Sequence, residues 1–410
     1  MKKRILAVLV AVLLVAGFLA ACGDNTPTPA PSPPTQGAAP EPPPAGDAPA
    51  DVTEVTIGAL APLTGPVAQF GEAVQQGVEL YIEQFNAQGG LQINVEWFNE
   101  EGQGPLGISG YFDLVDRGVT AIIGAVTSGV TMAVVPFAYE DGMPMISGTS
   151  THAGVTVDQD TGTVFTNMFR SCFIDPFQGY IMANFAADVI EAETVGVLYN
   201  NENAYSIGLT EAFIEQAEAR GLEVIIVETF QNQAVNFAGQ LTNIANANPD
   251  ALFVPYYYES VALMGSQSAG TTLDTIWLGA DGWATVLDMM LDPAPLEGAF
   301  YLTGFYVGAD DPMVRDFVDR FQAAHGILPN MFAAQAYDAA MILIAAIEAA
   351  IADGHEPNTD VFKQSVIAHM AATNLTGVTG HITFDQYNNP QKTAFIIEIV
   401  DGEETYWGSF

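Results

Sequence analysis

Short β-rich runs alternate with amphipathic helical patterns along most of this chain, and this alternation restricts its fold more than any other feature. The first strand is predicted at 55–60, and the helix after it carries Val74, Val78 and Phe85 at the 3.6-residue period before it ends at Gly89. Further strands are predicted at 93–98, 121–126 and 143–147. Strands that alternate with helices are typical of a parallel sheet covered by helices on both faces.

The same rhythm starts again after Asp175 and Pro176, which predicts a second lobe built like the first. Its strands are predicted at 194–199, 223–229, 251–256, 275–278 and 300–307. The remaining helices are predicted from the start signal Asp311-Pro312, at 331–352 and at 360–370. The last two strands, 381–384 and 394–400, are predicted to form an antiparallel pair. From residue 51 onward roughly 360 residues remain, more than one hydrophobic core usually serves, so we expect two lobes.

The first residues predict an export signal. Residues 2–4 are basic, and the apolar run 5–18 is too short to span a bilayer comfortably. Small residues precede Cys22, which resembles the lipobox of bacterial lipoproteins. The resemblance implies that 1–21 are removed and that Cys22 becomes the acylated N-terminus, anchored to the membrane. An ordinary signal peptide with an incidental cysteine is the alternative.

A proline-rich stretch follows Cys22. Residues 26–50 hold ten prolines among Ala, Thr, Ser and Gly, a composition that cannot bury a core and favours extended polyproline II. We therefore expect 22–51 to be a tether, and we expect no later stretch to cross the membrane. Cys172 is then the one remaining cysteine, so no intramolecular disulfide framework is expected.

The chain is strongly acidic, with 48 Asp and Glu against 10 Lys and Arg and a formal net charge of −38. Three of the ten basic residues lie in the predicted signal, which leaves seven in the mature chain. Nucleic acid and anionic membrane surfaces both require clustered cations, so neither is an expected partner.

No catalytic motif stands out. The chain has no Gly-x-Ser-x-Gly elbow, no phosphate-binding Gly-x-x-x-x-Gly-Lys loop, no His-Glu-x-x-His pair and no Gly-x-Gly-x-x-Gly after the first strand. Lone residues such as His152 and Cys172 are more often structural than catalytic. The sequence therefore predicts no enzymatic activity, no cofactor and no metal site.

Two segments carry a family resemblance. The sequences GALAPLTGPVAQFG at 58–71 and IIGAVTS at 122–128, in this order among the predicted elements, resemble the leucine/isoleucine/valine-binding protein family of type I periplasmic binding proteins. The resemblance implies two doubly wound Rossmann-like α/β lobes joined by a three-segment hinge near Ile174, 302–305 and 377–380. The implied lobe bounds are 52–174 with 304–378 for lobe 1, and 175–303 with 379–410 for lobe 2. It also implies a monomeric receptor that delivers an amino acid to the permease subunits of an ABC importer.

A free amino acid is a zwitterion, so burying it requires hydrogen-bond donors for its carboxylate and an acid for its ammonium. Donors gather at the carboxyl edge of a parallel sheet, where loops and helix N-termini meet. By resemblance, Ser128, Thr149 and Thr151 match the family residues that hold the carboxylate, Thr149 largely through its backbone; helix capping is their structural alternative. No arginine clamp is expected, because Arg170 is the sole basic residue in a predicted inter-lobe segment, where pairing with a nearby carboxylate is its structural alternative.

On the second lobe, Asp281 follows the predicted strand 275–278. By resemblance it matches the acid that meets the ammonium, although it is shorter than the glutamate of the best-known members, and Asp before Gly is also a turn signal. Tyr205 and Tyr257 match aromatic positions that close over the ligand, with the register inside the run 256–258 open by one residue. Lobe packing is the alternative for both tyrosines.

Phe70, Val126 and Phe332 match the side-chain pocket of the family, which implies an apolar ligand side chain; plain core packing is the alternative. Thr127 stands at one half-cystine position of the family's disulfide, and 99–104 lacks the other. We expect the two lobes to close over the ligand by hinge motion. The alternatives for the whole protein are a ligand sensor for a separate receptor, or a binder of an amide, a urea-like compound or a short peptide.

Overall fold

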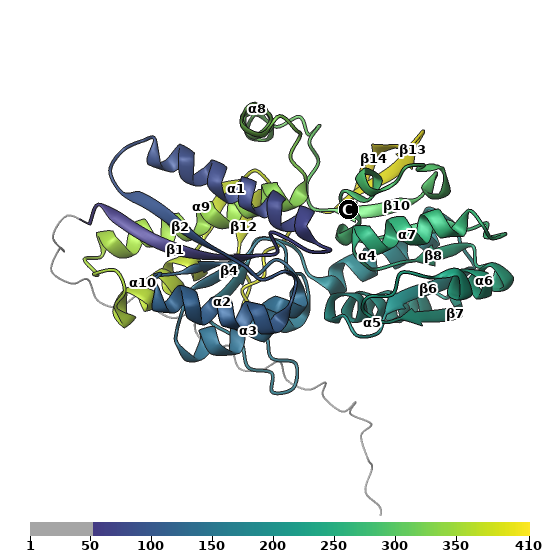
Figure 1. Cartoon of the computed structure of the whole chain (residues 1–410), viewed down its shortest axis with the longest axis horizontal. Helices are drawn as coiled ribbons and strands as arrows, with labels where there is room; N and C mark the ends of the chain where they lie inside the picture. Colours follow the sequence, from purple (N-terminus) through teal and green to yellow (C-terminus); the bar gives the residue numbers. More distant parts are fainter. Residues whose placement is uncertain (1–51) are drawn as a thin grey trace, which may run out of the picture. The chain divides into compact units, whose positions relative to one another are not determined.

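The computed structural model describes residues 52–410, which form two large β-sheets covered by helices and a small two-stranded sheet (Figure 1). We call each large sheet with its helices a lobe. All of these residues belong to one compact unit. The predicted signal sequence, Cys22 and the predicted tether lie outside the described residues.

The sheet of the first lobe holds five parallel strands in the order β2-β1-β3-β4-β5. They are β1 (Glu54–Ala61), β2 (Gln92–Asn99), β3 (Ile122–Ile123), β4 (Met145–Ser147) and β5 (Met168–Arg170). Helices α1 (Ala68–Asn86) and α9 (Met331–Ala352) pack together on one face, and α2 (Gly104–Asp116) and α3 (Ser128–Glu140) pack together on the other (Figure 1). The lobe is completed by α8 (Pro312–His325), which contacts α1, and α10 (Asp360–Ala371), which contacts α9.

Helix α9 is the central helix of this lobe. Among residues 52–410 it is the one helix long and apolar enough to cross a membrane, but 67% of its apolar window is buried inside the protein. It lies very close to α1 at Gly77, where a Cβ atom would come within 2.1 Å of the Ala333 carbonyl oxygen. Only glycine permits this approach, so the two helices form a tight apolar layer over the sheet.

The sheet of the second lobe holds seven strands in the order β14-β13-β10-β9-β8-β6-β7. Strands β6 to β10 are parallel, and β13 and β14 add to them in antiparallel fashion. The strands are β6 (Thr194–Asn200), β7 (Glu223–Phe230), β8 (Ala251–Phe253), β9 (Ile276–Gly279), β10 (Phe300–Thr303), β13 (Phe395–Val400) and β14 (Glu403–Ser409). The helices are α4 (Asp175–Asp188), which packs on α5 (Ala204–Ala219), and α6 (Ala238–Ala247), which packs on α7 (Tyr258–Ser268).

The chain passes between the two lobes three times. It leaves the first sheet after β5 and enters the second at β6, returns after β10 to α8 and α9, and reaches the second sheet again at β13. This topology confirms the predicted fold class of two α/β lobes joined by three segments. The residue bounds of the lobes stay predictions.

The predicted pairing of the last strands is wrong. Strand β12 (Gly380–Thr383) pairs with β11 (Asn374–Gly377), which sequence reasoning did not find, and β13 pairs with β10 and β14 instead. The two residues between β11 and β12 are the length of a tight hairpin turn, so the nearest partner of β12 is the strand immediately before it. Pairing was therefore decided by loop length and by an open sheet edge at β10.

Three strands end three to four residues earlier than predicted, all at their carboxyl ends: β3 at Ile123, β8 at Phe253 and β10 at Thr303. After β3, Gly124 has a φ of +131°, and a Cβ atom there would lie 2.5 Å from the Leu60 carbonyl oxygen. Glycine is required where the chain turns away from the sheet. The residues that leave β3 and β8 line the pocket described next.

Candidate functional site

A narrow pocket lies where the carboxyl ends of strands from both lobes meet. It is lined by Phe70, Val126, Thr127, Ser128, Thr149, Tyr205, Tyr257, Asp281, Gly282 and Phe332. Eight of the nine predicted site residues are in this set, and the exception is Thr151. The volume is about 10 Å³, room for about one water molecule. Side chains must move, or the lobes must separate, before a larger molecule can enter.

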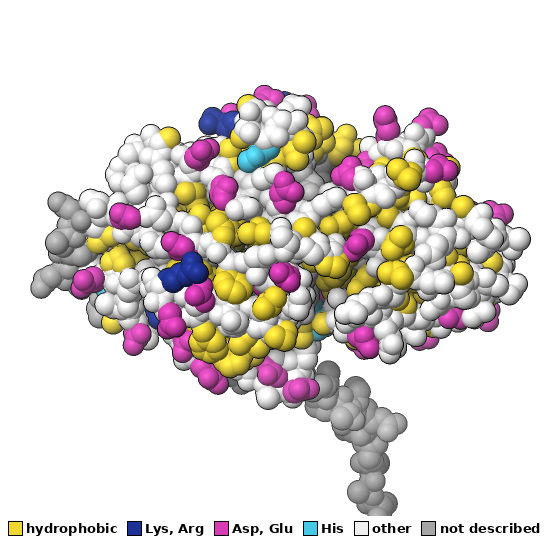
Figure 2. All heavy atoms as spheres, viewed as in Figure 1, with side chains coloured by type: hydrophobic (Ala, Val, Ile, Leu, Met, Phe, Trp, Pro, Cys, Tyr) yellow, Lys and Arg dark blue, Asp and Glu magenta, His cyan; other side chains and the backbone are white. Residues whose placement is uncertain are grey.

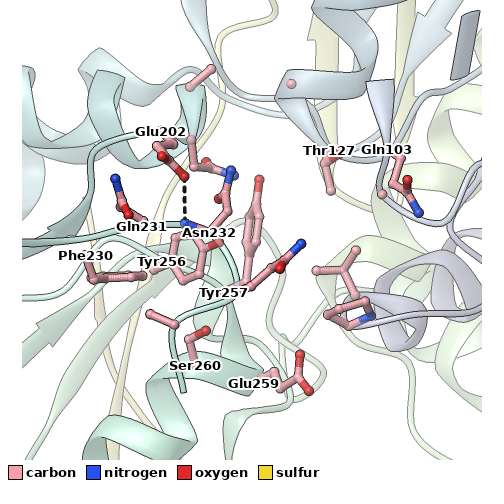
Figure 3. A pocket seen from close by; sticks show the side chains of 18 of the residues that line it. Gln103, Thr127, Glu202, Phe230, Gln231, Asn232, Tyr256, Tyr257, Glu259 and Ser260 are labelled. Carbon is pink, nitrogen blue, oxygen red and sulfur yellow. Dashed lines mark hydrogen bonds between the residues drawn. The ribbon is translucent and has the colours of Figure 1, made fainter. Parts of the chain in front are cut away.

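A wider cleft of about 780 Å³ opens beside the narrow pocket and shares Thr127 and Tyr257 with it. Figure 3 shows Gln103 and Thr127 of the first lobe on one side of this cleft and Tyr257 and Glu202 of the second lobe on the other. The Glu202 carboxylate accepts a hydrogen bond from the Asn232 backbone N–H at 2.9 Å. The cleft therefore adjoins the narrow pocket at Thr127 and Tyr257.

Ser128 begins α3, so it lies at the positive end of a helix dipole. Its hydroxyl oxygen accepts a hydrogen bond from the His152 backbone N–H at 3.2 Å, which leaves the hydroxyl proton to be donated. The side chain of Thr127, the N-cap residue, makes no capping bond. The N–H groups in the first turn of a helix have no partner within that helix, so this point can hold an anion without a basic side chain.

Thr149 and Thr151 both follow β4 but differ in what they offer. Thr149 lines the pocket, and its hydroxyl donates to the Val126 carbonyl oxygen at 2.7 Å while its N–H donates to Ser147 Oγ at 3.2 Å. Thr151 is fully buried, and its hydroxyl makes no hydrogen bond of good geometry within the described chain. The Thr151 hydroxyl lies near the carboxyl group of Asp175. To contact a ligand, Thr149 has to exchange one of these hydrogen bonds for one to the ligand, and the buried Thr151 has to become exposed.

Asp281 belongs to a closed set of four hydrogen bonds on the second lobe. It lies two residues after the end of β9 and is only 2% exposed. Its Oδ1 accepts from the Tyr205 hydroxyl at 2.7 Å and from Gln178 Nε2 at 3.0 Å. Its backbone N–H donates to Gln178 Oε1 at 3.0 Å, and the Gly282 N–H donates to the Tyr205 hydroxyl oxygen at 2.8 Å. The carboxylate is therefore fixed in place at the wall of the pocket.

Two buried acids lie near one another here. Burial raises the pKa of Asp281 to about 6, although the hydrogen bonds from Tyr205 and Gln178 lower it. Burial also raises the pKa of Asp175 well above its usual range, and the nearby Asp281 charge adds to this effect while Arg170 opposes it. A positively charged group in the pocket would stabilise the ionised form of Asp281.

Aromatic rings close the pocket. Tyr205 and Tyr257 stack with their ring centres 5.0 Å apart. Phe70 of the first lobe meets the edge of Tyr257 at 5.7 Å and lies 4.2 Å from the ring of Phe332. Of the tyrosines in the run 256–258, Tyr257 lines the narrow pocket. Contacts between rings of opposite lobes leave the pocket almost filled by its own walls.

Sequence reasoning missed Gln178 and Asp175. Both are fully buried in the first turn of α4, whose other buried residues are small or apolar. Residues three apart share a helix face, so two polar residues on a buried face were the signal that was available. Neither carboxyl oxygen of Asp175 has a hydrogen bond of good geometry to any residue in 52–410.

Arg170 does not line the pocket. Its fully buried guanidinium donates to the Ser150 carbonyl oxygen at 2.8 Å and to Thr156 Oγ1 at 3.1 Å. The ion pair with a carboxylate that was considered for it does not form within residues 52–410. Burial, and then the charge of Arg170, lower the pKa of His152 to about 4, so this histidine is neutral near pH 7.

No Lys, Arg or His is among the described residues that line the narrow pocket or the cleft, whereas Asp281, Glu101, Glu202 and Glu259 are. Figure 2 shows acidic side chains spread over the visible face with few basic ones. A field of this sign opposes the entry of anions that carry no compensating positive charge.

Two α/β lobes joined by three segments, with polar groups of both lobes around one pocket, define a two-lobed binding protein. Residues 54–404 match the profile of the family described as periplasmic binding protein. The chain belongs to this family. Membership implies an extracytoplasmic location and a role in binding.

Relatives with known names support this assignment. The Leu/Ile/Val-binding protein homolog 3 of Brucella melitensis is 26% identical over 300 residues, which are 72% of this chain and 79% of the relative. The crystal structure of the branched-chain amino acid transporter substrate binding protein LivJ from Streptococcus pneumoniae, in complex with isoleucine, is 27% identical with a TM-score of 0.79, and the match covers 87% of this chain and 99% of LivJ. A solute binding protein of an ABC transporter from R. palustris, in complex with benzoate, is 23% identical with a TM-score of 0.78 over 87% of this chain and 96% of the other, a likeness that shows the fold alone.

Proposed function

We propose that this chain is the substrate-binding lipoprotein of an ABC importer and that it binds a small amino acid, with a branched-chain or other apolar side chain, between its lobes. The observation that carries the proposal is the presence of Ser128, at a helix N-terminus, and the buried acid Asp281 around one narrow pocket. A zwitterion satisfies both groups at once, because its carboxylate takes the donors and its ammonium takes the acid.

The roles of the residues follow from this pairing. Ser128 donates its hydroxyl proton to the ligand carboxylate, together with N–H groups of α3, and Thr149 and Thr151 join through the backbone and the hydroxyl. Asp281 receives the ammonium, and Tyr205 and Tyr257 cover the ligand. A ligand with a carboxylate but no ammonium would leave Asp281 unpaired and bring a second negative charge beside it, which is unfavourable in a buried site.

The ligand side chain is proposed to be apolar because Phe70, Val126 and Phe332 form the rest of the pocket wall. The transfer of an aliphatic group from water into an apolar pocket is favourable by about 0.8 kcal/mol for each buried CH₂. The names of relatives agree with this choice, since one is a Leu/Ile/Val-binding protein homolog and another was crystallised with isoleucine.

Binding is proposed to proceed by hinge closure. The carboxylate first binds the open first lobe, and the ammonium then draws Asp281 of the second lobe towards it, so that the closed state is favoured by contacts that the open state lacks. We take the lobes to be 52–174 with 304–378, and 175–303 with 379–410. The permease subunits of the importer would recognise the closed shape of the monomer.

Membrane attachment is proposed to occur through an acylated Cys22, with 22–51 as the tether. Metabolic labelling with a palmitate analogue tests this directly, because the native chain should take up label and sediment with membranes while Cys22→Ser should do neither. Equal labelling of both chains would show that Cys22 is not the anchor.

A ligand screen by thermal shift tests the function. The Cys22→Ser chain is mixed with each common amino acid, with urea, acetamide and dipeptides, and with benzoate as a carboxylate without an ammonium. A ligand at 100 times its Kd stabilises the folded chain by about 2.7 kcal/mol. We expect leucine, isoleucine or valine to stabilise most and benzoate to have no effect. If benzoate, urea or acetamide stabilised the folded chain and no amino acid did, the proposal of an amino-acid ligand would be wrong. The sensor alternative would be favoured if this chain binds an amino acid and its neighbouring genes encode a receptor in place of a permease.

A further inference from the structure

The carboxylate of Asp281 accepts a hydrogen bond from a residue outside the pocket. Gln178 lies in the first turn of α4, is fully buried and does not line the pocket. Its carboxamide makes two reciprocal hydrogen bonds to Asp281: Nε2 donates to Oδ1 at 3.0 Å, and Oε1 accepts from the Asp281 N–H at 3.0 Å. The two residues are 103 positions apart in the chain, so folding brings them together.

The direction of each donor is fixed by the backbone. A peptide N–H can only donate, so the Asp281 N–H requires the oxygen of the carboxamide on its side and places the NH₂ group of Gln178 against Oδ1. In the same way, the Gly282 N–H occupies a lone pair of the Tyr205 hydroxyl, whose proton is then directed to Oδ1. Both donors are thus preset before any ligand arrives.

We propose that Gln178 is the positioning residue of the ammonium-binding carboxylate, which it keeps ionised and oriented so that Oδ2 is left for the ligand. This inference rests on the proposed function, because it assigns Asp281 to the ammonium. Its physical basis is that donors fixed on one oxygen stabilise the carboxylate form over the protonated form in a buried site. Because Asp281 Oδ1 already accepts two hydrogen bonds, Oδ2 is the oxygen that is left to bind the ammonium.

The alternative is that Gln178 only ties α4 to the segment after β9. A purely structural tie would change stability but not the protonation of Asp281. Gln335 provides a matched control, because it is also a fully buried carboxamide, on α9, and neither of its polar atoms has a hydrogen bond of good geometry within the described chain.

The test is a carbon NMR titration of the aspartate carboxyl groups in the ligand-free Cys22→Ser chain, with the Asp281 signal assigned by its loss in Asp281→Asn. Gln178→Met keeps the length of the side chain and removes both hydrogen bonds. We expect the Asp281 midpoint to rise by about one pH unit in Gln178→Met and to stay at the native value in Gln335→Met. An unchanged midpoint in Gln178→Met would overturn the proposal.

Leucine affinity near pH 7 gives the second readout. It should fall about tenfold in Gln178→Met, and part of the loss should be regained near pH 9, where Asp281 is ionised again. If Gln178→Met fails to fold by circular dichroism, Gln178→Glu replaces it, because a carboxylate at this place removes the NH₂ donor and should raise the Asp281 midpoint further. Failure of the native chain to bind any amino acid would contradict the proposed function, whereas the titration would still decide whether Gln178 controls Asp281.

Discussion

The two halves of the candidate site present different chemistry to the same pocket. On the first lobe, Ser128 and Thr149 line the pocket with hydroxyl groups, which do not change charge near neutral pH. On the second lobe, Asp281 lines the pocket with a carboxyl whose pKa burial raises to about 6. One half is built from neutral dipoles, and the other from a single buried charge.

This difference predicts an uneven division of binding energy. Neutral hydroxyls and helix N–H groups cost less to bury than a charge and can rearrange, so the loss of one of them leaves others in place. A buried carboxylate is unfavourable by itself and is stabilised when an ammonium pairs with it. We therefore expect changes on the second lobe to have larger effects than changes on the first.

The largest effect is expected for Asp281→Asn. Removing one partner of a buried charge pair should weaken leucine binding by roughly 3 kcal/mol, or about 100-fold. Isothermal titration calorimetry measures this loss. Asp288→Asn is the control, because Asp288 is an exposed acid on the same lobe and should leave the affinity unchanged. If Asp281→Asn bound leucine as tightly as the native chain, Asp281 would not be the residue that binds the ammonium.

Acidification should weaken binding about tenfold between about pH 8 and about pH 5. The carboxylate is the form that binds an ammonium, so affinity is retained above the raised pKa of Asp281, about 6, and is lost as the pH falls through it. The ligand-free chain should respond in the opposite direction: because the folded pKa lies above the unfolded value, protonation of Asp281 stabilises the folded state as the pH falls.

Calorimetry across this pH range separates the two halves of the site. The affinity of Asp281→Asn should be almost independent of pH, since the titrating group is gone. The affinity of Ser128→Ala should fall at acidic pH in the same way as that of the native chain. If the affinity of Asp281→Asn also fell at acidic pH, the pH dependence would belong to another group, such as Asp175.

A smaller effect is expected for Ser128→Ala. Loss of one hydroxyl donor to a carboxylate should cost about 1 to 1.5 kcal/mol, or five- to tenfold in affinity. Ser266→Ala serves as the control, because the Ser266 hydroxyl donates to the Ala262 carbonyl oxygen within α7 and lies outside the pocket. A larger loss for Ser128→Ala than for Asp281→Asn would reverse the comparison between the lobes.

The smallest effect on binding is expected for Thr149→Val. The Thr149 hydroxyl already donates to the Val126 carbonyl oxygen at 2.7 Å, so its removal should lower the free energy of unfolding by about 1 kcal/mol. Leucine affinity should change by less than about twofold. Urea unfolding and calorimetry of the same preparation measure both quantities, and a loss of affinity as large as that of Ser128→Ala would give the hydroxyl a direct role.

Local signals in the sequence were sufficient for α8 and α9. The predicted range 331–352 coincides with α9, and Asp311, the predicted N-cap of α8, accepts a hydrogen bond from the Met313 N–H at 2.7 Å. Caps and periodic patterns depend on residues a few positions apart, which a single sequence displays. The pairing of β13 with β10 joins residues nearly 100 positions apart, and no local pattern specifies it.

The same distinction explains what was predicted at the site. Ser128 and Asp281 were predicted by resemblance to the family, and both lie in the segment that follows a strand, on the edge of the sheet that the fold class determines. Gln178 was missed because its role depends on a contact with Asp281 that only the folded chain brings together. The early end of β8 was missed because the tyrosines after Phe253 suit a strand, although Pro255 cannot donate to a sheet, and Tyr256 and Tyr257 leave the sheet to line the cleft and the pocket.

The central claim is that one pocket binds both charges of a zwitterion, and calorimetry with three matched ligands tests it most directly. L-leucine carries both charges, leucinamide lacks the carboxylate and isocaproate lacks the ammonium. We expect leucine to bind the native chain at least about tenfold more tightly than leucinamide and about 100-fold more tightly than isocaproate. Isocaproate binding as tightly as leucine would contradict it.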